Sequence, residues 1–227
     1  MKYGILCAMA EELKELSVAM TDVQEIKIAD FTFYQGLINN HEVVIVQSGI
    51  GKVQAAIVTT LLIANFKIDY MINSGSAGGI GAGLQVGDVV ISTGTAYHDA
   101  DVTAFGYLPG QLPQQPQIFV SDRVLGENIK LAAENTGLNV KLGLIVSGDQ
   151  FIADEAKIAE IKAIYPEVLC CEMEGAAVGQ VAQQFKVPYV VVRAMSDVAD
   201  GQADQSFDEF IIEAGKRSAQ MILNLLK

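Results

Sequence analysis

Six side chains that follow predicted strands or begin helices indicate which chemistry this chain could perform. They comprise three carboxylates, one guanidinium, one hydroxyl and one aromatic ring: Glu12, Glu174, Asp197, Arg193, Ser76 and Phe151. Ligands of open α/β sheets bind beyond the carboxyl ends of the strands, so we expect these side chains to line one pocket. The set contains neither a nucleophilic cysteine nor a catalytic histidine.

Paired carboxylates without a metal suit the cleavage of a glycosidic bond through an oxocarbenium-like state. One carboxylic acid protonates the leaving group while the other, ionised, activates water. The ring of Phe151 could stack on a planar leaving group. The residue types therefore favour hydrolysis of a glycosidic bond over nucleophilic or metal-assisted catalysis.

The segment 190–197 is the clearest example of a predicted strand that ends in charged residues. Val190–Val192 is a β-branched run, typical of a strand covered on both faces, and it leads into Arg193, Ser196 and Asp197. A lone Asp in such a place is more often a surface residue of a strand-to-loop turn. Glu12 also has a simpler role, because acids in the first turn of a helix complement its dipole, and residues 10–20 have helical spacing.

Two glycine-rich segments resemble nucleotide-binding loops but fail the spacing. Residues 48–52 read Ser-Gly-Ile-Gly-Lys, yet Val46 and Val53 stand where a P-loop needs Gly and Ser or Thr. The run 74–83, after a strand at 70–73, has Leu84 where a dinucleotide fingerprint needs glycine, and no helix pattern follows. We predict a pocket-lining turn at 48–52 and backbone that closely approaches a ligand at 74–83.

The segment 97–117 has no convincing periodicity and holds three of the five prolines. Long loops in compact domains are usually functional or packed on something. Its apolar residues, such as Phe105 and Leu108, are therefore expected either to cover this subunit's own pocket or to pack against a partner subunit.

Strand and helix patterns alternate along all 227 residues, without repeats or linkers. This alternation predicts a single α/β domain over 1–227, a three-layer α/β/α sandwich with a central mixed, mostly parallel sheet. A capping box, Ser206-x-x-Glu209, predicts where the last helix begins.

Composition limits the partners. The formal charge is −12 and only three arginines are present, which argues against nucleic acid or an anionic membrane. The three cysteines lie in apolar runs, which indicates reduced core residues of a cytoplasmic protein, and the two histidines show no metal-binding spacing. We expect no metal, no cofactor and no membrane span.

The chain also resembles the 5′-methylthioadenosine/S-adenosylhomocysteine nucleosidases of the nucleoside phosphorylase superfamily. The matching segments keep the family's order over nearly the whole chain: residues 8–12, 48–52, 73–79, 97–101, 146–152, 172–174 and 191–197. The resemblance implies the nucleoside phosphorylase-like fold, a cytoplasmic homodimer and adenine thionucleosides as substrates. One departure is Ala10, where family members often carry a third consecutive Glu, and Gly175 is a smaller one.

The resemblance implies a role for each catalytic residue. Asp197 would protonate adenine at N7, and Glu12 would activate water for attack on C1′. Ser76 and Arg193 would position that water. Burial and nearby carboxylates favour the protonated form of a carboxyl group, whereas a nearby guanidinium opposes it.

The remaining implied residues bind substrate. Glu174 would bond the ribose hydroxyls above Met173, Phe151 would stack on adenine, and the backbone of Ile152 would read its edge. Ala77, Gly78 and Ser196 would complete this part of the pocket. The alkylthio pocket would be formed by Met9, Ile50 and Phe207, with Phe105 and Pro113 from the other subunit.

Two other functions remain as alternatives for the same residues. In a nucleoside phosphorylase, phosphate would replace water, but its dianion needs cations near the sugar and Glu12 would repel it. A non-catalytic adenine-nucleoside sensor would have no use for an acid and a base.

Overall fold

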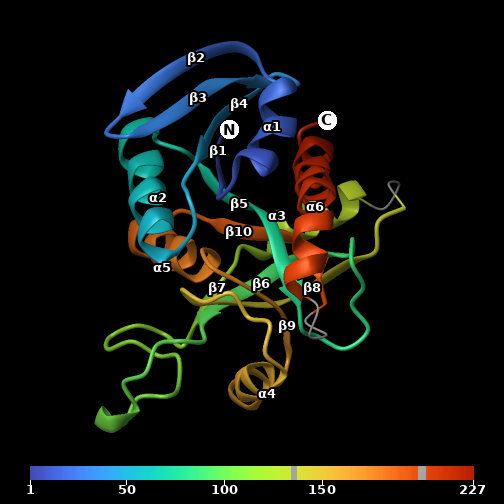
Figure 1. The fold of residues 1–227 in the computed structure, drawn as a ribbon. Helices are drawn as coiled ribbons and strands as arrows, with labels where there is room; N and C mark the ends of the chain where they lie inside the picture. Colours follow the sequence, from blue (N-terminus) through green and yellow to red (C-terminus); the bar gives the residue numbers. More distant parts are fainter. Residues whose placement is uncertain (134–136, 199–202) are drawn as a thin grey trace.

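The computed structural model describes residues 1–133, 137–198 and 203–227, and for 203–209 it describes the backbone alone. Its strands form one mixed sheet (Figure 1). They are β1 (Lys2–Cys7), β2 (Thr21–Ile28), β3 (Phe31–Ile38), β4 (His41–Gln47), β5 (Tyr70–Gly79), β6 (Val89–Tyr97), β7 (Ile118–Val120), β8 (Val140–Ser147), β9 (Val168–Glu172) and β10 (Tyr189–Asp197).

The order of the strands is β10-β6-β8-β9-β5-β1-β4-β3-β2, with β7 beside β6. Strand β10 also pairs with β5, so five strands close into a ring that the linear order does not reveal. Strands β4, β1, β5 and β10 lie side by side and run parallel to one another, so their carboxyl ends meet at one edge. The site lies at that edge.

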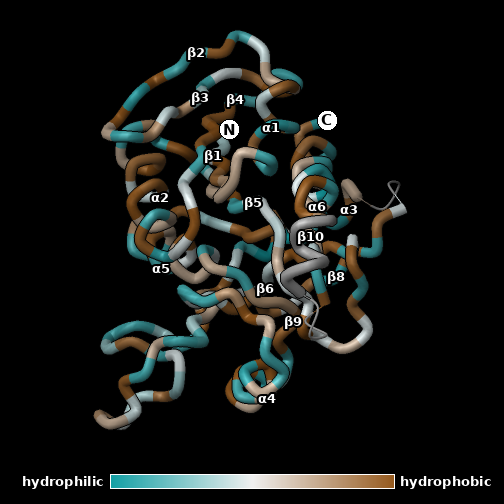
Figure 2. Tube along the Cα trace, in the orientation of Figure 1, coloured by the Kyte–Doolittle hydropathy of each residue, from teal (hydrophilic) through white to brown (hydrophobic). Residues whose placement is uncertain are grey.

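Helices cover both faces of the sheet. Helices α2 (Lys52–Phe66) and α5 (Gly175–Phe185) pack together on one face, and α1 (Ala10–Val18), α3 (Arg123–Ala133) and α6 (Ala203–Leu225) pack on the other (Figure 1). Helix α4 (Glu155–Ile164) packs on a third, smaller cluster. Figure 2 shows the hydrophobic residues concentrated along the central strands. The predicted fold class is confirmed.

The glycine-rich run is where the predicted boundaries differ most from the structure. The sequence predicts a strand that ends at residue 73, whereas β5 continues to Gly79. Its glycines permit close packing rather than a loop: a Cβ on Gly75 would lie 2.1 Å from Nη1 of Arg193, and one on Gly78 would lie 2.9 Å from Oδ2 of Asp197. The small residues of this half of β5 thus leave room for the side chains of Arg193 and Asp197.

The predicted capping box is wrong, because α6 begins at Ala203, three residues before Ser206. Strand β2, which the sequence analysis did not identify, is an exposed edge strand paired with β3. After Tyr97, the last residue of β6, the segment 97–117 contains only the short 3₁₀ helix Thr103–Phe105. Within the described residues, no helix is long and apolar enough to span a bilayer.

Candidate active site

A cavity of about 320 Å³ lies at the carboxyl ends of β1, β5, β9 and β10. Thirteen of the sixteen residues predicted for the site line it. They are Met9, Glu12, Ile50, Ser76, Ala77, Gly78, Phe151, Ile152, Met173, Glu174, Arg193, Ser196 and Asp197. Residues separated by almost two hundred positions in sequence thus face one space, as the strand-end argument predicts.

Glu12 both caps its helix and faces the cavity. Its Oε2 accepts hydrogen bonds from the backbone N–H groups of Ala8 (2.9 Å) and Met9 (3.0 Å), just before α1. Its Oε1 accepts from the backbone N–H (3.1 Å) and the hydroxyl (3.2 Å) of Ser76. The residue is only 1% exposed, and this burial raises the pKa of its carboxyl group, although Arg193 and the hydrogen bonds oppose the rise. A buried carboxylate of increased basicity suits a general base.

A β-bulge directs Asp197. Met195 pairs with Ala77 and Asp197 pairs with Gly78, so Ser196 is an extra residue on β10. Bulges next to active sites commonly redirect a side chain. The hydroxyl of Ser196 donates to Oδ1 of Asp197 at 2.9 Å, and Asp197 itself is 1% exposed. The carboxyl group is therefore held at the cavity wall opposite Gly78, away from bulk water.

Arg193 forms the centre of a buried polar network. Its Nη2 donates to Oδ1 of Asn73 (2.6 Å), to Oε2 of Glu174 (3.2 Å) and to Glu172. Burial alone would lower the pKa of the guanidinium, but Glu172 and Glu174 outweigh burial and raise it. Arg193 therefore stays charged, held between Glu172 and Glu174.

Glu174 joins this network to the turn before α2. Its Oε1 accepts from the backbone N–H of Gly51 at 2.9 Å, just before α2. Burial, opposed by Arg193 and reinforced by Glu172, raises the pKa of Glu174 to about 7. Its side chain can therefore either accept or donate hydrogen bonds near neutral pH.

Comparison with known proteins agrees with this geometry. The family model described as "Phosphorylase superfamily" matches residues 2–227. The 5′-methylthioadenosine/S-adenosylhomocysteine nucleosidase of Actinobacillus succinogenes is 54% identical over 226 residues, covering 100% of this chain and 98% of that protein.

Solved structures agree as closely. A nucleosidase of this name from S. pneumoniae, with a transition-state inhibitor, has a TM-score of 0.96 and 50% identity, covering 100% of this chain and 99% of that one. One from Colwellia psychrerythraea, in complex with adenine, has a TM-score of 0.97 and 43% identity, covering 100% and 94%. The chain belongs to the 5′-methylthioadenosine/S-adenosylhomocysteine nucleosidase family.

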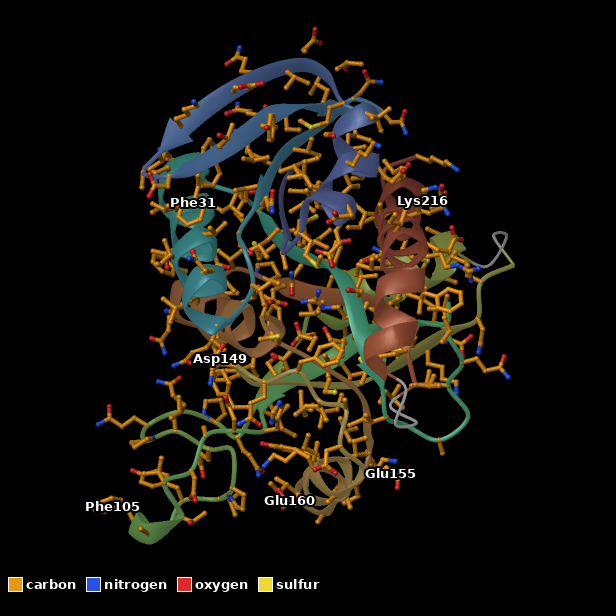
Figure 3. The ribbon with its side chains drawn as sticks, viewed as in Figure 1. Phe31, Phe105, Asp149, Glu155, Glu160 and Lys216 are labelled. Atoms are coloured by element: carbon orange, nitrogen blue, oxygen red, sulfur yellow. The ribbon has the colours of Figure 1, made fainter. Side chains whose placement is uncertain are left out.

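Two of the residues predicted for this nucleosidase family member, Phe105 and Pro113, do not line the cavity. Phe105 is 81% exposed and lies at the far tip of the loop 97–117, which Figure 3 shows projecting away from Asp149. Pro113 lies in the same loop and is likewise absent from the cavity wall. The loop therefore does not bring either residue to its own subunit's pocket. Phe207 lies outside the residues whose side chains are described.

Sequence reasoning missed four residues that line the cavity of the nucleosidase: Ala8, Gln150, Cys171 and Glu172. Glu172 matters most, because it is the end of β9 and pairs with Arg193. It also accepts from the hydroxyl of Ser147 and from the backbone N–H groups of Glu174 (3.0 Å) and Gly175 (2.8 Å). The strand-end rule would have found Glu172, since it directly follows the apolar part of β9.

Proposed function

We propose that this protein hydrolyses the N-glycosidic bond of 5′-methylthioadenosine and S-adenosylhomocysteine, releasing adenine and the corresponding thioribose. The observation that carries the proposal is the placement of Glu12 and Asp197 on one small, buried cavity. Glu12 is ordered by four hydrogen bonds and Asp197 by a bulge and Ser196.

The proposed reaction balances through these two groups. The bond between C1′ and N9 breaks, its electron pair passes to adenine, and Asp197 delivers a proton to N7. Water adds to C1′ while Glu12 takes up its proton, with Ser76 and Arg193 aligning that water. Phe151 would stack on adenine and Ile152 would bond its edge, while Glu174 and Met173 hold the ribose.

Hydrolysis fits the electrostatics better than phosphorolysis. Among the described residues that line the cavity, Arg193 is the only cation, and it is already paired with Glu172 and Glu174. A phosphate dianion would meet these carboxylates and Glu12 without a cation left to balance it. A neutral water molecule meets no such repulsion.

Cleavage of methylthioadenosine in phosphate-free buffer prepared with ¹⁸O-labelled water tests this proposal. We expect free adenine and methylthioribose labelled at C1, measured by mass spectrometry. A strict requirement for phosphate would instead establish a phosphorylase. Binding of the nucleoside without turnover would establish a sensor.

We further propose that the protein works as a homodimer in which the loop 97–117 completes the partner's alkylthio pocket. Phe105 and Leu108 are 81% and 55% exposed, which is unusual for apolar side chains of a freely solvated loop. The loop is not loose, because the hydroxyl of Tyr165 donates to the carbonyl of Tyr97 at 2.9 Å and Gly110 N–H donates to that of Ala100 at 2.9 Å. Ile50 and Phe151, both more than half exposed, leave the mouth of the cavity open to such a contribution.

We also propose a cytoplasmic location. All three cysteines are free and buried, which is usual in a reducing compartment.

A further inference from the structure

Three of the segments that carry the family resemblance each contain a charged residue that the proposed mechanism does not use. These residues are Lys52, Asp99 and Asp149, and the structure brings them together. Lys52 begins α2, Asp99 follows β6, and Asp149 follows β8. None of the three lines the cavity.

Their contacts form a closed circuit. Nζ of Lys52 donates to both carboxylate oxygens of Asp99, at 2.8 and 2.7 Å, and lies 3.6 Å from Oδ2 of Asp149. The backbone N–H of Lys52 donates to Oδ1 of Asp149 at 2.8 Å. The backbone N–H of Asp149 in turn donates to Oδ2 of Asp99 at 2.9 Å. Each residue therefore holds the other two through charge-assisted hydrogen bonds.

The circuit is partly buried. The side chains of Lys52 and Asp99 are 25% and 13% exposed, and Nζ of Lys52 also lies 5.4 Å from the centre of the Tyr97 ring. Burial would raise the pKa of Asp99, but the hydrogen bonds from Lys52 and Asp149 outweigh it and lower that pKa. Asp99 is therefore a firmly ionised anchor at neutral pH.

Both ends of the circuit continue into the cavity wall. On one side, Ile50 lines the cavity and the N–H of Gly51 holds Glu174. On the other side, Gln150, Phe151 and Ile152 line it immediately after Asp149. Figure 3 shows Asp149 close to the beginning of α2.

Gly51 allows the two walls to meet this closely. Its φ of +100° is a conformation that other residues rarely adopt, and a Cβ at this position would lie 3.1 Å from Oδ1 of Asp149. The backbone of the turn before α2 thus lies directly against the carboxylate of Asp149, with no Cβ of residue 51 between them.

We propose that Lys52, Asp99 and Asp149 form a positioning clasp that fixes the purine wall of the cavity, residues 150–152, against the ribose wall at Gly51 and Glu174. Lys52 acts through Asp149 and touches no substrate atom. This inference rests on the proposed function only in naming adenine and ribose as the groups that the two walls hold.

Replacing Lys52 with Met tests the clasp, because it removes the cation and keeps an apolar chain of similar length. The KM for methylthioadenosine should rise about tenfold while kcat changes less than about threefold, since the chemical groups stay and only the walls are misaligned. The dissociation constant of adenine alone should rise by a similar factor, measured by equilibrium dialysis. Lys141→Met is the matched control, because Lys141 is also partly buried and donates to the carbonyl of Gly83 at 3.1 Å, far from the clasp.

A double-mutant cycle separates positioning from general loss of stability. Asp99→Asn keeps an acceptor for the N–H of Asp149 but loses the ion pair with Lys52. If the two residues act as one unit, the double variant should raise KM no more than Lys52→Met alone. Light scattering should show the same assembly for all variants.

Three results would overturn the proposal that these residues form a positioning clasp. These are an adenine affinity of Lys52→Met equal to that of Lys141→Met, additive effects in the cycle, or a rise in KM that accompanies dissociation of the assembly. If the unmodified protein fails to cleave methylthioadenosine, the proposed function is wrong, and adenine binding still decides the clasp separately.

Discussion

Replacing Glu12 with Gln should abolish most turnover without abolishing binding. The carboxylate accepts four hydrogen bonds, two on each oxygen. A glutamine can keep the pair from Ala8 and Met9 if its carbonyl oxygen faces them. Its NH₂ group then faces Ser76, whose hydroxyl can rotate to accept but whose backbone N–H cannot. The variant therefore leaves one buried donor unsatisfied, which costs about 1–3 kcal/mol of folding free energy.

The rise in the activation barrier should be larger than this loss of folding free energy. An amide cannot take up the proton of water, and general-base groups contribute about 10²–10⁴-fold to rate, or about 2.7–5.5 kcal/mol. We expect kcat, measured by adenine release at saturating methylthioadenosine, to fall at least ~100-fold, while the nucleoside dissociation constant changes much less. Glu11→Gln is the matched control, because Glu11 is the adjacent residue and is exposed.

The pH profile provides a second measurement on the same variant. Burial raises the pKa of Glu12, so the unmodified enzyme should lose activity on the acid side at a pH above the ordinary value of ~4.3. That limb should be missing from the residual activity of Glu12→Gln. A kcat within a few-fold of the Glu11→Gln control would show that Glu12 only caps α1, and the reasoning about the base would fail.

Three further predictions follow from the site and the loop. Gly75→Ala places a Cβ 2.1 Å from Nη1 of Arg193 and 2.8 Å from Oε1 of Glu12, so kcat/KM should fall ~10²-fold or more in the adenine-release assay; near-normal activity would show that both groups can move. The pKa of Glu174 in the folded protein is raised to about 7, so its contribution to stability is full below its unfolded pKa and is lost as the pH rises toward 7. The unfolding free energy, measured by urea titration, should therefore decline less between about pH 5 and pH 8 in Glu174→Gln than in the unmodified protein. An unchanged decline would show that other groups cause it. Phe105→Asp should weaken the proposed dimer and raise KM together, and a fully active monomer by light scattering would refute the proposal that the loop 97–117 completes the partner's pocket.

The sequence predicts the elements and the inventory of the site better than it predicts how the site is held together. Strand-end residues such as Glu12 and Asp197 could be found because apolar runs lead directly to them or to their helix. The extent of β5 could not, because its polar and glycine-rich half has no strand-like pattern and becomes a strand by pairing with β10 on one side and, at its end, with β9 on the other. Ring closure of the sheet is a tertiary event without a local signal.

Side-chain partners distant in sequence were also beyond local reasoning. The pairing of Arg193 with Glu172, and the circuit that joins Lys52 to Asp149, depend on which strands lie side by side. The bulge at Ser196 is likewise invisible in the sequence of β10 alone, since it exists only relative to the register of β5. The capping box failed for a related reason, because a favourable local motif can lie inside a helix that begins earlier.

The kinetics of Asp197→Asn test the central claim most directly. Asn keeps the shape and an oxygen for the Ser196 hydroxyl, which donates to Oδ1 at 2.9 Å, but it has no proton to transfer to adenine. The variant should bind methylthioadenosine normally and lose ~10²-fold or more in kcat, on the order of 2.7 kcal/mol in the barrier. It should also lose the basic limb of the pH–rate profile, because a general acid works only while protonated. If Asp197→Asn cleaves methylthioadenosine within a few-fold of the unmodified enzyme, the proton comes from elsewhere and the mechanism is wrong.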